Sequence, residues 1–181
     1  MLMRHRTESP EALTALAHPV RLDLLDLLAL HGPLTASEAA RRLDQTAANI
    51  SWHLRKLGQY GFVRQAMSGP GRRRPWKLVA EAVSASEPDV DSGPESALAE
   101  VVVDRERQRL RRALSSRATE SAPWRAVIGV RTTTTWLTAD EARRLTDEID
   151  RLVHAAVRRS DGQRPDDARP VSLVGWLIPA E

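Results

Sequence analysis

Apolar residues between positions 35 and 60 recur every three or four residues, in two blocks separated by Asp44 and Gln45. The first block predicts a helix over residues 35–43, which opens with the Thr-x-x-Glu spacing of a capping box. The second block predicts a longer helix over residues 46–60. We expect the apolar positions of this second helix to face the core, and they are Ala47, Ile50, Leu54 and Leu57.

The opposite face of the 46–60 helix is polar and cationic. Its amide, hydroxyl, imidazole and cationic groups suit the base edges and phosphates of a DNA major groove. Asparagine and glutamine can each bond adenine through two hydrogen bonds, which makes Asn49 and Gln45 candidate base readers. We predict that this helix binds DNA through Gln45, Thr46, Asn49, Trp52, His53, Arg55 and Lys56.

Two of these side chains have a second interpretation. His53 either faces DNA or packs against the preceding helix and bonds a backbone carbonyl, because histidines are common in surroundings of mixed polarity. Trp52 either contacts a thymine methyl group or the DNA backbone, or it is an exposed residue of a protein interface. The sequence leaves both pairs of alternatives open.

The residues after Gly61 complete a recognisable motif. Residues 62–67 and 76–79 are predicted as two short strands around a Gly/Pro-rich tip, which is the pattern of a β-hairpin. The tip carries Arg72, Arg73 and Arg74, which repel one another unless a polyanion lies nearby. We therefore expect these three arginines to bind the phosphates or the minor groove of DNA.

Two further helices are predicted before this motif, over residues 9–17 and 20–30, because a proline stands at the start of each. Arg21 in the second of them either contacts the DNA backbone or pairs with Asp26 or another acid of the same domain. The sequence alone does not separate these two roles.

The positive charge of the chain is concentrated in the same region. Residues 1–80 carry 12 basic against 6 acidic side chains, a balance of +6, whereas residues 81–181 carry 15 against 18, a balance of −3. Between Arg41 and Lys77 nine basic residues accompany a single acid, Asp44. Charge and motif therefore point to the same nucleic-acid surface.

These features together resemble the ArsR/SmtB family of bacterial repressors over residues 8–80. The resemblance is carried by Ala17-His-Pro-Val-Arg21 before a leucine-rich helix, by Ser51-x-His53-Leu54, and by Gly61-Phe62-Val63. It implies a dimeric winged helix-turn-helix protein whose 46–60 helix enters the major groove while the hairpin grips the backbone. The chain departs from the metal-sensing branch of the family, because it has no cysteine for a thiolate metal site.

The second half of the chain follows a linker at residues 80–94, which is dominated by Ser, Glu, Pro, Asp and Gly. A helix is predicted over residues 95–117, and arginines crowd its middle. They either make a second nucleic-acid contact or pair with acids of the acidic C-terminal half, and we favour the pairing. These arginines are Arg105, Arg107, Arg109, Arg111 and Arg112.

Beyond that helix the pattern predicts a strand, a helix and a strand, as in a small C-terminal module of some actinobacterial relatives. Residues 123–137 and 171–178 are rich in apolar and β-branched residues, which favour strands. Thr138 and Glu141 form a second capping box. The helix after them carries an apolar seam at heptad spacing, formed by Ala142, Leu145, Ile149, Leu152 and Ala156. A two-stranded unit of this kind is weak alone, so it should pack against the long helices or a second subunit.

Several kinds of chemistry find no support in the sequence. Zero cysteines exclude disulfides, and no catalytic or phosphate-binding motif is present, so we expect neither an enzyme nor a cofactor. Asp147, Asp150 and His154 share one helix face, which suits either a zinc or nickel site or an ordinary solvated Asp–His pair, and we expect the pair. No apolar run approaches the length of a membrane span, so we expect a cytoplasmic protein without a membrane partner.

The sequence thus predicts an α+β protein. An N-terminal winged helix-turn-helix domain covers residues 8–80, and a dimerisation or regulatory region over residues 95–181 is built as helix, strand, helix and strand. We expect a homodimeric, sequence-specific repressor that binds an inverted repeat in double-stranded DNA and responds to a small-molecule or protein effector. The alternative is an interaction protein, such as an antirepressor or nucleoid component, whose DNA contact is non-specific and collapses in salt.

Overall fold

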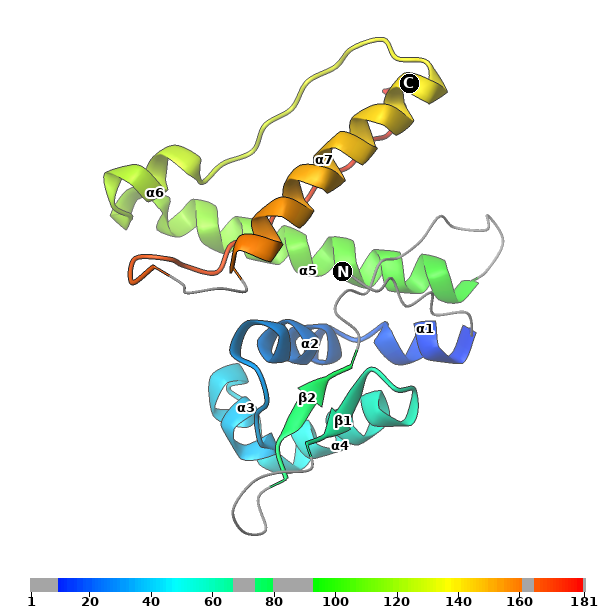
Figure 1. The fold of residues 1–181 in the computed structure, drawn as a ribbon, viewed down its shortest axis with the longest axis vertical. Coiled ribbons are helices and arrows are strands. Elements are labelled where there is room, and N and C mark those ends of the chain that lie inside the picture. The colour runs from blue at the N-terminus through cyan, green and yellow to red at the C-terminus, as the bar shows by residue number, and fades with distance from the viewer. Residues whose placement is uncertain (1–9, 67–73, 80–92, 161–164, 181) are drawn as a thin grey trace. The chain divides into compact units, whose positions relative to one another are not determined.

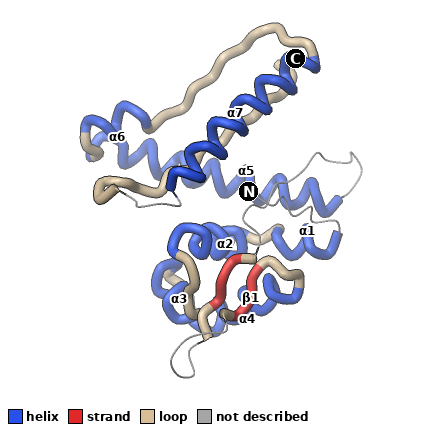
Figure 2. The backbone as a smooth tube through the Cα atoms, viewed as in Figure 1, coloured by secondary structure: helices blue, strands red, loops and turns tan. Residues whose placement is uncertain are grey.

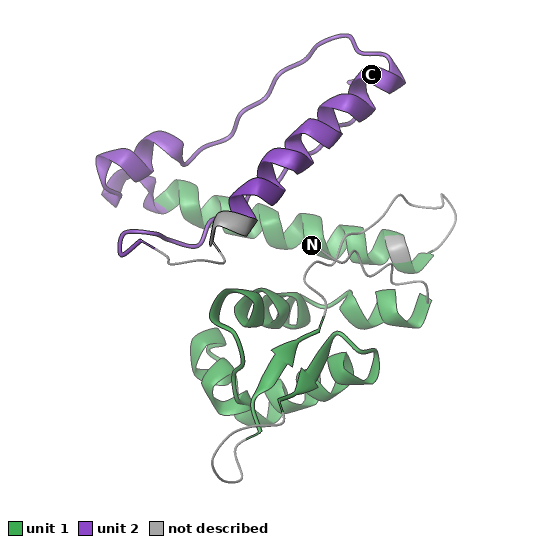
Figure 3. Ribbon diagram, viewed as in Figure 1, with its two compact units in different colours: residues 1–115 green, residues 116–181 purple. Residues whose placement is uncertain are grey.

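The computed structural model describes residues 10–66, 74–79, 93–160 and 165–180, and its element order is shown in Figure 1. The chain divides into two compact units, residues 1–115 and 116–181, which we call the N-terminal and C-terminal units (Figure 3). Residues 80–92 of the predicted 80–94 linker, and the wing residues Arg72 and Arg73, lie outside the described residues, whereas residues 93 and 94 belong to α5.

The N-terminal unit is a winged helix-turn-helix domain with one additional long helix. The predicted helices and hairpin are confirmed, with their ends shifted by at most two residues. The elements are α1 (Pro10–Leu16), α2 (Pro19–His31), α3 (Ala36–Leu43), α4 (Ala47–Gln59), β1 (Val63–Gln65), β2 (Trp76–Leu78) and α5 (Gly93–Ser116).

One hydrophobic core joins these helices. Leucines and an isoleucine from α1, α2 and α4 fill its centre without any solvent exposure, and they are Leu16, Leu24, Ile50, Leu54 and Leu57. Leu98 of α5 is 1% exposed and belongs to the same cluster. Burying such side chains contributes roughly 1.5–3 kcal/mol each, so this core accounts for much of the stability of the unit.

Local signals set the ends of the two central helices. Thr35 Oγ1 accepts from the amide of Glu38 at 3.3 Å, and Glu38 Oε2 accepts from the amide of Thr35 at 2.8 Å, which confirms the predicted capping box of α3. Asp44 ends α3 in the left-handed region at φ 52°, a conformation that Asp tolerates better than most residues. The turn between α3 and α4 therefore follows from Asp44 and from Thr46, whose hydroxyl caps α4.

The wing is an antiparallel hairpin that packs on α4. Arg64 of β1 pairs with Lys77 of β2, and Leu34 adds a single bridge to Trp76 on the other edge (Figure 2). The Trp76 ring covers Gly58 of α4 so closely that a β-carbon at position 58 would lie 3.0 Å from Cζ3 of the indole. Glycine at position 58 is therefore what allows the wing to approach the helix.

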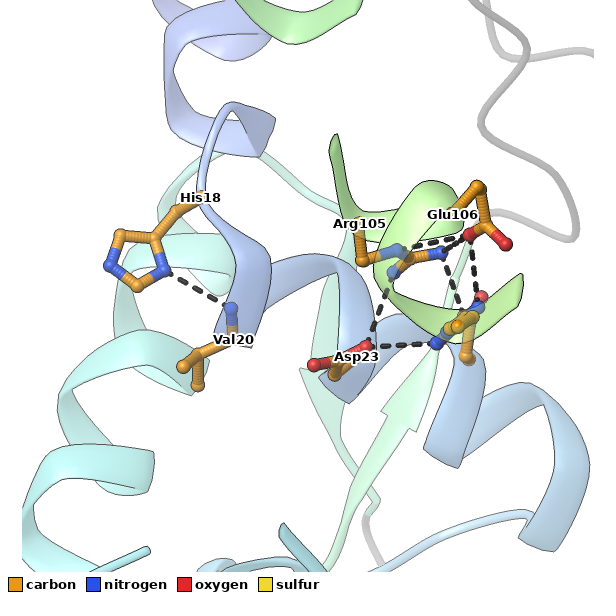
Figure 4. Close-up of polar contacts among 7 residues, drawn as sticks. His18, Val20, Asp23, Arg105 and Glu106 are labelled. Atoms are coloured by element: carbon orange, nitrogen blue, oxygen red, sulfur yellow. Dashed lines mark hydrogen bonds and ion pairs between the residues drawn. The ribbon is translucent and has the colours of Figure 1, made fainter. Parts of the chain in front are cut away.

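An ion network joins α5 to α2. Arg105 donates to Asp23 at 3.5 Å and to Asp26 at 3.0 Å, and Arg109 donates to each of them at 2.8 Å. Glu106 lies beside both arginines, and Figure 4 shows Arg105 between Asp23 and Glu106. For three of the five arginines the predicted pairing with acids is confirmed, and Asp104 and Glu106 of the C-terminal half are among the partners of Arg105, Arg107 and Arg109. The pairing with Asp23 and Asp26 of α2 was not predicted. The dimerisation or regulatory region was predicted to begin at residue 95. In the structure, α5 up to residue 115 belongs to the N-terminal unit.

The C-terminal unit contains the 3-10 turn η1 (Arg117–Thr119), α6 (Ala122–Val127) and α7 (Ala139–Ser160). The second capping box is confirmed, because Thr138 and Glu141 exchange hydrogen bonds at 2.8 and 3.3 Å at the start of α7. Over the described ranges, no helix is both long enough and apolar enough to cross a bilayer.

Both strands predicted for the C-terminal unit are wrong. Residues 122–127 are helical, since Pro123 occupies the first turn, where its fixed φ favours a helix start. The rest of the predicted strand at 123–137 and all of 171–178 form neither helix nor strand. A strand requires a partner for its backbone, and β propensity does not supply one.

Candidate nucleic-acid interface

The two faces of α4 differ completely in exposure. The inner face presents Ile50, Leu54 and Leu57 to the core, all at 0% exposure. The outer face is open, and Trp52 is 53% exposed on it. The other open or half-open positions of the α4 region, as predicted, are Gln45, Thr46, Asn49, Arg55 and Lys56.

A pair of side-chain amides lies at the start of this face. Asn49 Nδ2 donates to Gln45 Oε1 at 2.9 Å, so each amide restricts the rotation of the other. The bond uses one hydrogen of Nδ2 and leaves its second hydrogen and the carbonyl oxygen of Asn49 available. Asn49 can therefore still present one donor and one acceptor, the pair that matches the major-groove edge of adenine.

Two cations lie further along the same helix. Arg55 Nε donates to the backbone carbonyl of Ser51 at 3.3 Å, which leaves its terminal nitrogens available for a phosphate. Lys56 Nζ lies 5.1 Å from the centre of the Tyr60 ring, within cation–π range. Both cations are thus held near the helix surface by weak contacts that an anion can replace.

An open groove of about 690 Å³ lies where α3, the start of α4 and the base of the wing meet. Arg41 of α3 and Arg74 of the wing line it together with Gln45. The amino terminus of α4 adds backbone amides and the positive end of the helix dipole. Glu38 also lines the groove, with its carboxylate bonded to Thr35, so two cations face one acid. This balance, together with the helix start, suits a phosphate of the DNA backbone.

Two positions of α4 do not lie where the sequence predicted. His53 is 3% exposed, so its assignment to the outer face is wrong. Its burial agrees with the alternative, but the predicted bond to a backbone carbonyl is not seen, because Nδ1 of His53 has no hydrogen-bond partner within the described part of the chain. Ala47 was predicted to face the core and is exposed, because it opens the first turn of α4 beside the polar turn. Positions 50, 53, 54 and 57 form a continuous helical stripe, and this spacing is the signal that could have placed His53 inside.

His53 belongs to a buried basic cluster that the sequence did not reveal. Its ring centre lies 4.6 Å from that of His18, whose Nδ1 accepts from the amide of Val20 at 3.2 Å and so caps α2 (Figure 4). Burial, followed by the nearby His18 and Arg21, lowers the pKa of His53 to about 4. Burial also lowers the pKa of His18 and of Arg21. The neutral ring of His53 is the form that fits this site.

Arg21 takes up neither of its two predicted roles, which were contact with the DNA backbone and pairing with an acid such as Asp26. Its side chain is 9% exposed, and its Nε has no hydrogen-bond partner within the described part of the chain. Asp26, the predicted acid partner, is engaged by Arg105 and Arg109 of α5. A buried Arg21 has little surface to offer a phosphate, so we leave it out of the candidate interface.

On the possible metal face of α7, the contact seen for His154 is to backbone and not to the carboxylate of the predicted Asp–His pair. His154 Nδ1 contacts the backbone oxygen of Asp150, one turn earlier in the helix. Across the described ranges, no three histidine or carboxylate side chains come together as a metal site would require.

One family comparison identifies a domain in this part of the chain. Residues 16–66 match the family model of a helix-turn-helix domain, which spans α2 to β1 and covers less than half of the chain. No curated protein matches the chain. Among solved structures, the transcriptional regulator Tm0710 from Thermotoga maritima aligns with 12% identity and a TM-score of 0.31, over 78% of this chain and 77% of its own. The chain thus carries a helix-turn-helix domain, the kind found in DNA-binding regulators.

Proposed function

We propose that the protein is a sequence-specific transcriptional regulator that inserts α4 into the major groove of DNA. The observation that carries this proposal is the division of α4 into two faces. Its inner face is fully buried, while its outer face holds an exposed amide pair, an indole and two cations that the fold does not use. Amides and cations on one exposed helix are the groups that distinguish base pairs and bind phosphates.

The wing and the groove supply the backbone contacts in this proposal. Arg74 lines the groove with Arg41, so both are positioned to bind phosphates while Asn49 and Gln45 read bases. Arg72 and Arg73 complete the basic wing in the sequence. Contacts of this kind add affinity that depends on salt concentration and contribute little to sequence preference.

We further infer a cytoplasmic homodimer of the ArsR/SmtB type that acts as a repressor. A two-fold dimer presents two copies of α4, so the operator is an inverted repeat with half-sites about 10 base pairs apart. An effector, either a small molecule or a partner protein, would act through the C-terminal unit. The lack of cysteine excludes thiolate ligands from this regulation.

The test is footprinting on the protein's own upstream region, followed by the variant Asn49→Ala. Asparagine is a mediocre helix former, so the melting temperature should stay the same or rise slightly. Binding to the protected site should weaken by about 1–3 kcal/mol, and binding to random DNA by far less. Two binding isotherms at one salt concentration and one melting curve measure this.

A matched control is Gln108→Ala, which removes another exposed amide that is bonded within its own helix, here to Asp104 of α5. This variant should bind both DNAs as the parent protein does. A drop in melting temperature for Asn49→Ala with an unchanged ratio of specific to random binding would show that Asn49 is structural. The absence of any protected site would refute the proposed function itself.

A further inference from the structure

Two stretches of the C-terminal unit leave their backbone without partners. We call residues 129–137 the first extended segment and residues 173–178 the second extended segment. Neither contains a helix or strand, and the first runs as a long arc in Figure 2. Within the described chain, no hydrogen bond joins the backbone of either segment to another backbone group. Such segments offer a full set of donors and acceptors to another strand.

Both segments also expose large apolar side chains. In the first segment, Trp136 is 96% exposed and Val130 is 59% exposed. In the second, Leu173 and Ile178 are 73% and 75% exposed, and Trp176 is 62% exposed. A run of exposed apolar residues such as Leu173 to Ile178 marks an interaction site in a folded protein.

The start of each segment is nevertheless held in place beside α6. Arg117 Nε donates to the carbonyl of Ile128 at 3.0 Å, immediately before the first segment. Before the second segment, Arg169 binds both carboxylate oxygens of Glu120, at 2.7 and 3.1 Å, and its guanidinium lies 4.9 Å from the centre of the Trp124 ring. The segments are therefore tethered at one end and unpartnered along their length.

The side-chain patterns assign different places to the two segments in a sheet. The first segment alternates, with Val130 and Trp136 on one parity and Arg131 on the other, so only one of its faces suits burial. The second segment is apolar on both parities, because Leu173 and Val174 are followed by Trp176 and further apolar residues. A strand that is apolar on both faces belongs at the centre of a sheet, and an alternating one suits its edge.

We propose that a second copy of this chain completes these segments as a four-stranded intermolecular sheet. The two second segments pair antiparallel across a two-fold axis at its centre, and the two first segments form its edges. Two-fold symmetry supplies the antiparallel pairing directly, since the same segment meets itself. Two strands are marginal alone, whereas four strands with an apolar face are not. This inference deepens the homodimer of the proposed function and rests on it.

The exposed apolar side chains of the two segments supply a substantial part of the area that a stable dimer needs. Trp136 and Trp176 of the two chains would together bury on the order of 600 Å². A stable interface needs about 1,200–2,000 Å², and the aliphatic residues of the segments with Leu152 of α7, which is 73% exposed, extend the area toward this range. An unrelated peptide could pair with one segment, but a second copy offers partners for both segments at once.

The experiment is hydrogen exchange by mass spectrometry on the full chain, at a high concentration and after dilution through the dissociation constant. Amides of residues 173–178 should be protected at high concentration and should exchange freely after dilution. Amides of α4 serve as the internal control, because their protection comes from a core that lies within one chain. Protection that does not change on dilution, or no protection at either concentration, would overturn the inference.

Sedimentation of three variants gives a second measurement. Val174→Pro removes a central strand amide and should weaken the dimer by about tenfold or more, while the conservative control Val174→Thr should leave it nearly unchanged. Val130→Pro, in an edge strand, should have the smaller effect of the two prolines. Equal dimerisation by Val174→Pro and the parent protein would refute the central pairing.

The two proposals fail in different ways. A chain that is monomeric at all concentrations, yet protects a defined DNA site, would refute the sheet and leave the regulator in place. A dimer with protected second segments that binds all DNA sequences alike would support the sheet and refute the sequence-specific function.

Discussion

The two units of this chain use the same local signals and differ in what their helices pack against. The capping boxes of α3 and α7 have the same distances, 2.8 Å and 3.3 Å, for their paired hydrogen bonds. In the N-terminal unit, α3 packs against a core with five side chains at 0% exposure. In the C-terminal unit, which contains α7, no described side chain is buried. Local signals in the sequence are therefore enough to start a helix, whereas forming a core also requires a complementary surface for that helix to pack against.

The strongest way to break this comparison is to make the same truncation in both units. Leu54→Ala should destabilise the N-terminal unit by about 2–5 kcal/mol, because Leu54 is fully buried and its loss leaves a cavity. Leu152→Ala should change the unfolding of that unit by less than about 0.5 kcal/mol. Urea unfolding followed by exchange of the α4 amides measures both. Similar losses for the two variants would mean that the units unfold as one.

A histidine in each unit sharpens the comparison through pH. Burial first, then His18 and Arg21, lowers the pKa of His53 to about 4, whereas an unfolded histidine titrates near its usual 6.5. The unfolded chain therefore takes up the proton first as the pH falls. The stability that neutral His53 contributes is complete above pH 6.5, is lost as the pH falls through 4, and amounts to about 3 kcal/mol.

The measurement is the free energy of unfolding of the N-terminal unit between pH 7 and 4. His53→Gln should flatten the part of its pH dependence that belongs to this ring. His154→Gln, in the other unit, should retain the full dependence. If His53→Gln keeps the slope of the parent protein, the ring is not neutral and buried as the structure has it.

The smallest expected effect compares the two capping boxes. Thr35→Ala should cost the N-terminal unit about 1 kcal/mol, since α3 loses a cap and unfolds with the core. Thr138→Ala removes a cap of the same geometry from α7 and should leave the unfolding of the N-terminal unit unchanged. Thermal melts with exchange readouts for each helix separate the two results. A shift of the N-terminal melt by Thr138→Ala would show coupling between the units.

The N-terminal fold was predictable from sequence because its signals are local. These signals are the capping pair Thr35 and Glu38, the prolines that open α1 and α2, and the spacing of the buried residues of α4, and each acts within a few residues. His53 was assigned to the outer face of α4 because a polar side chain suggested solvent exposure. Its position on the helix instead places it in the core. The burial of an imidazole depends on its neighbours, and here they include His18 from a distant turn.

Contacts between residues that lie far apart in the sequence could not be predicted. The acids that bind Arg105 and Arg109 lie about 80 residues earlier, at Asp23 and Asp26, and no spacing in the sequence connects them. The strand predicted over residues 123–137 was wrong for a related reason. Its residues favour a pleated conformation, but hydrogen-bond partners for it are lacking elsewhere in the described chain.

The contact between Gly58 and Trp76 limits how this protein could be retargeted. The outward positions of α4 can be varied without touching the fold, but position 58 of a helix grafted from another regulator would face the Trp76 ring. Even the β-carbon of an alanine there requires the indole to shift by a few tenths of an ångström, and a larger side chain requires more of Trp76, which bridges to Leu34. The packing of α4 and of the wing is thus coupled, and an engineered change of DNA target would have to replace both together.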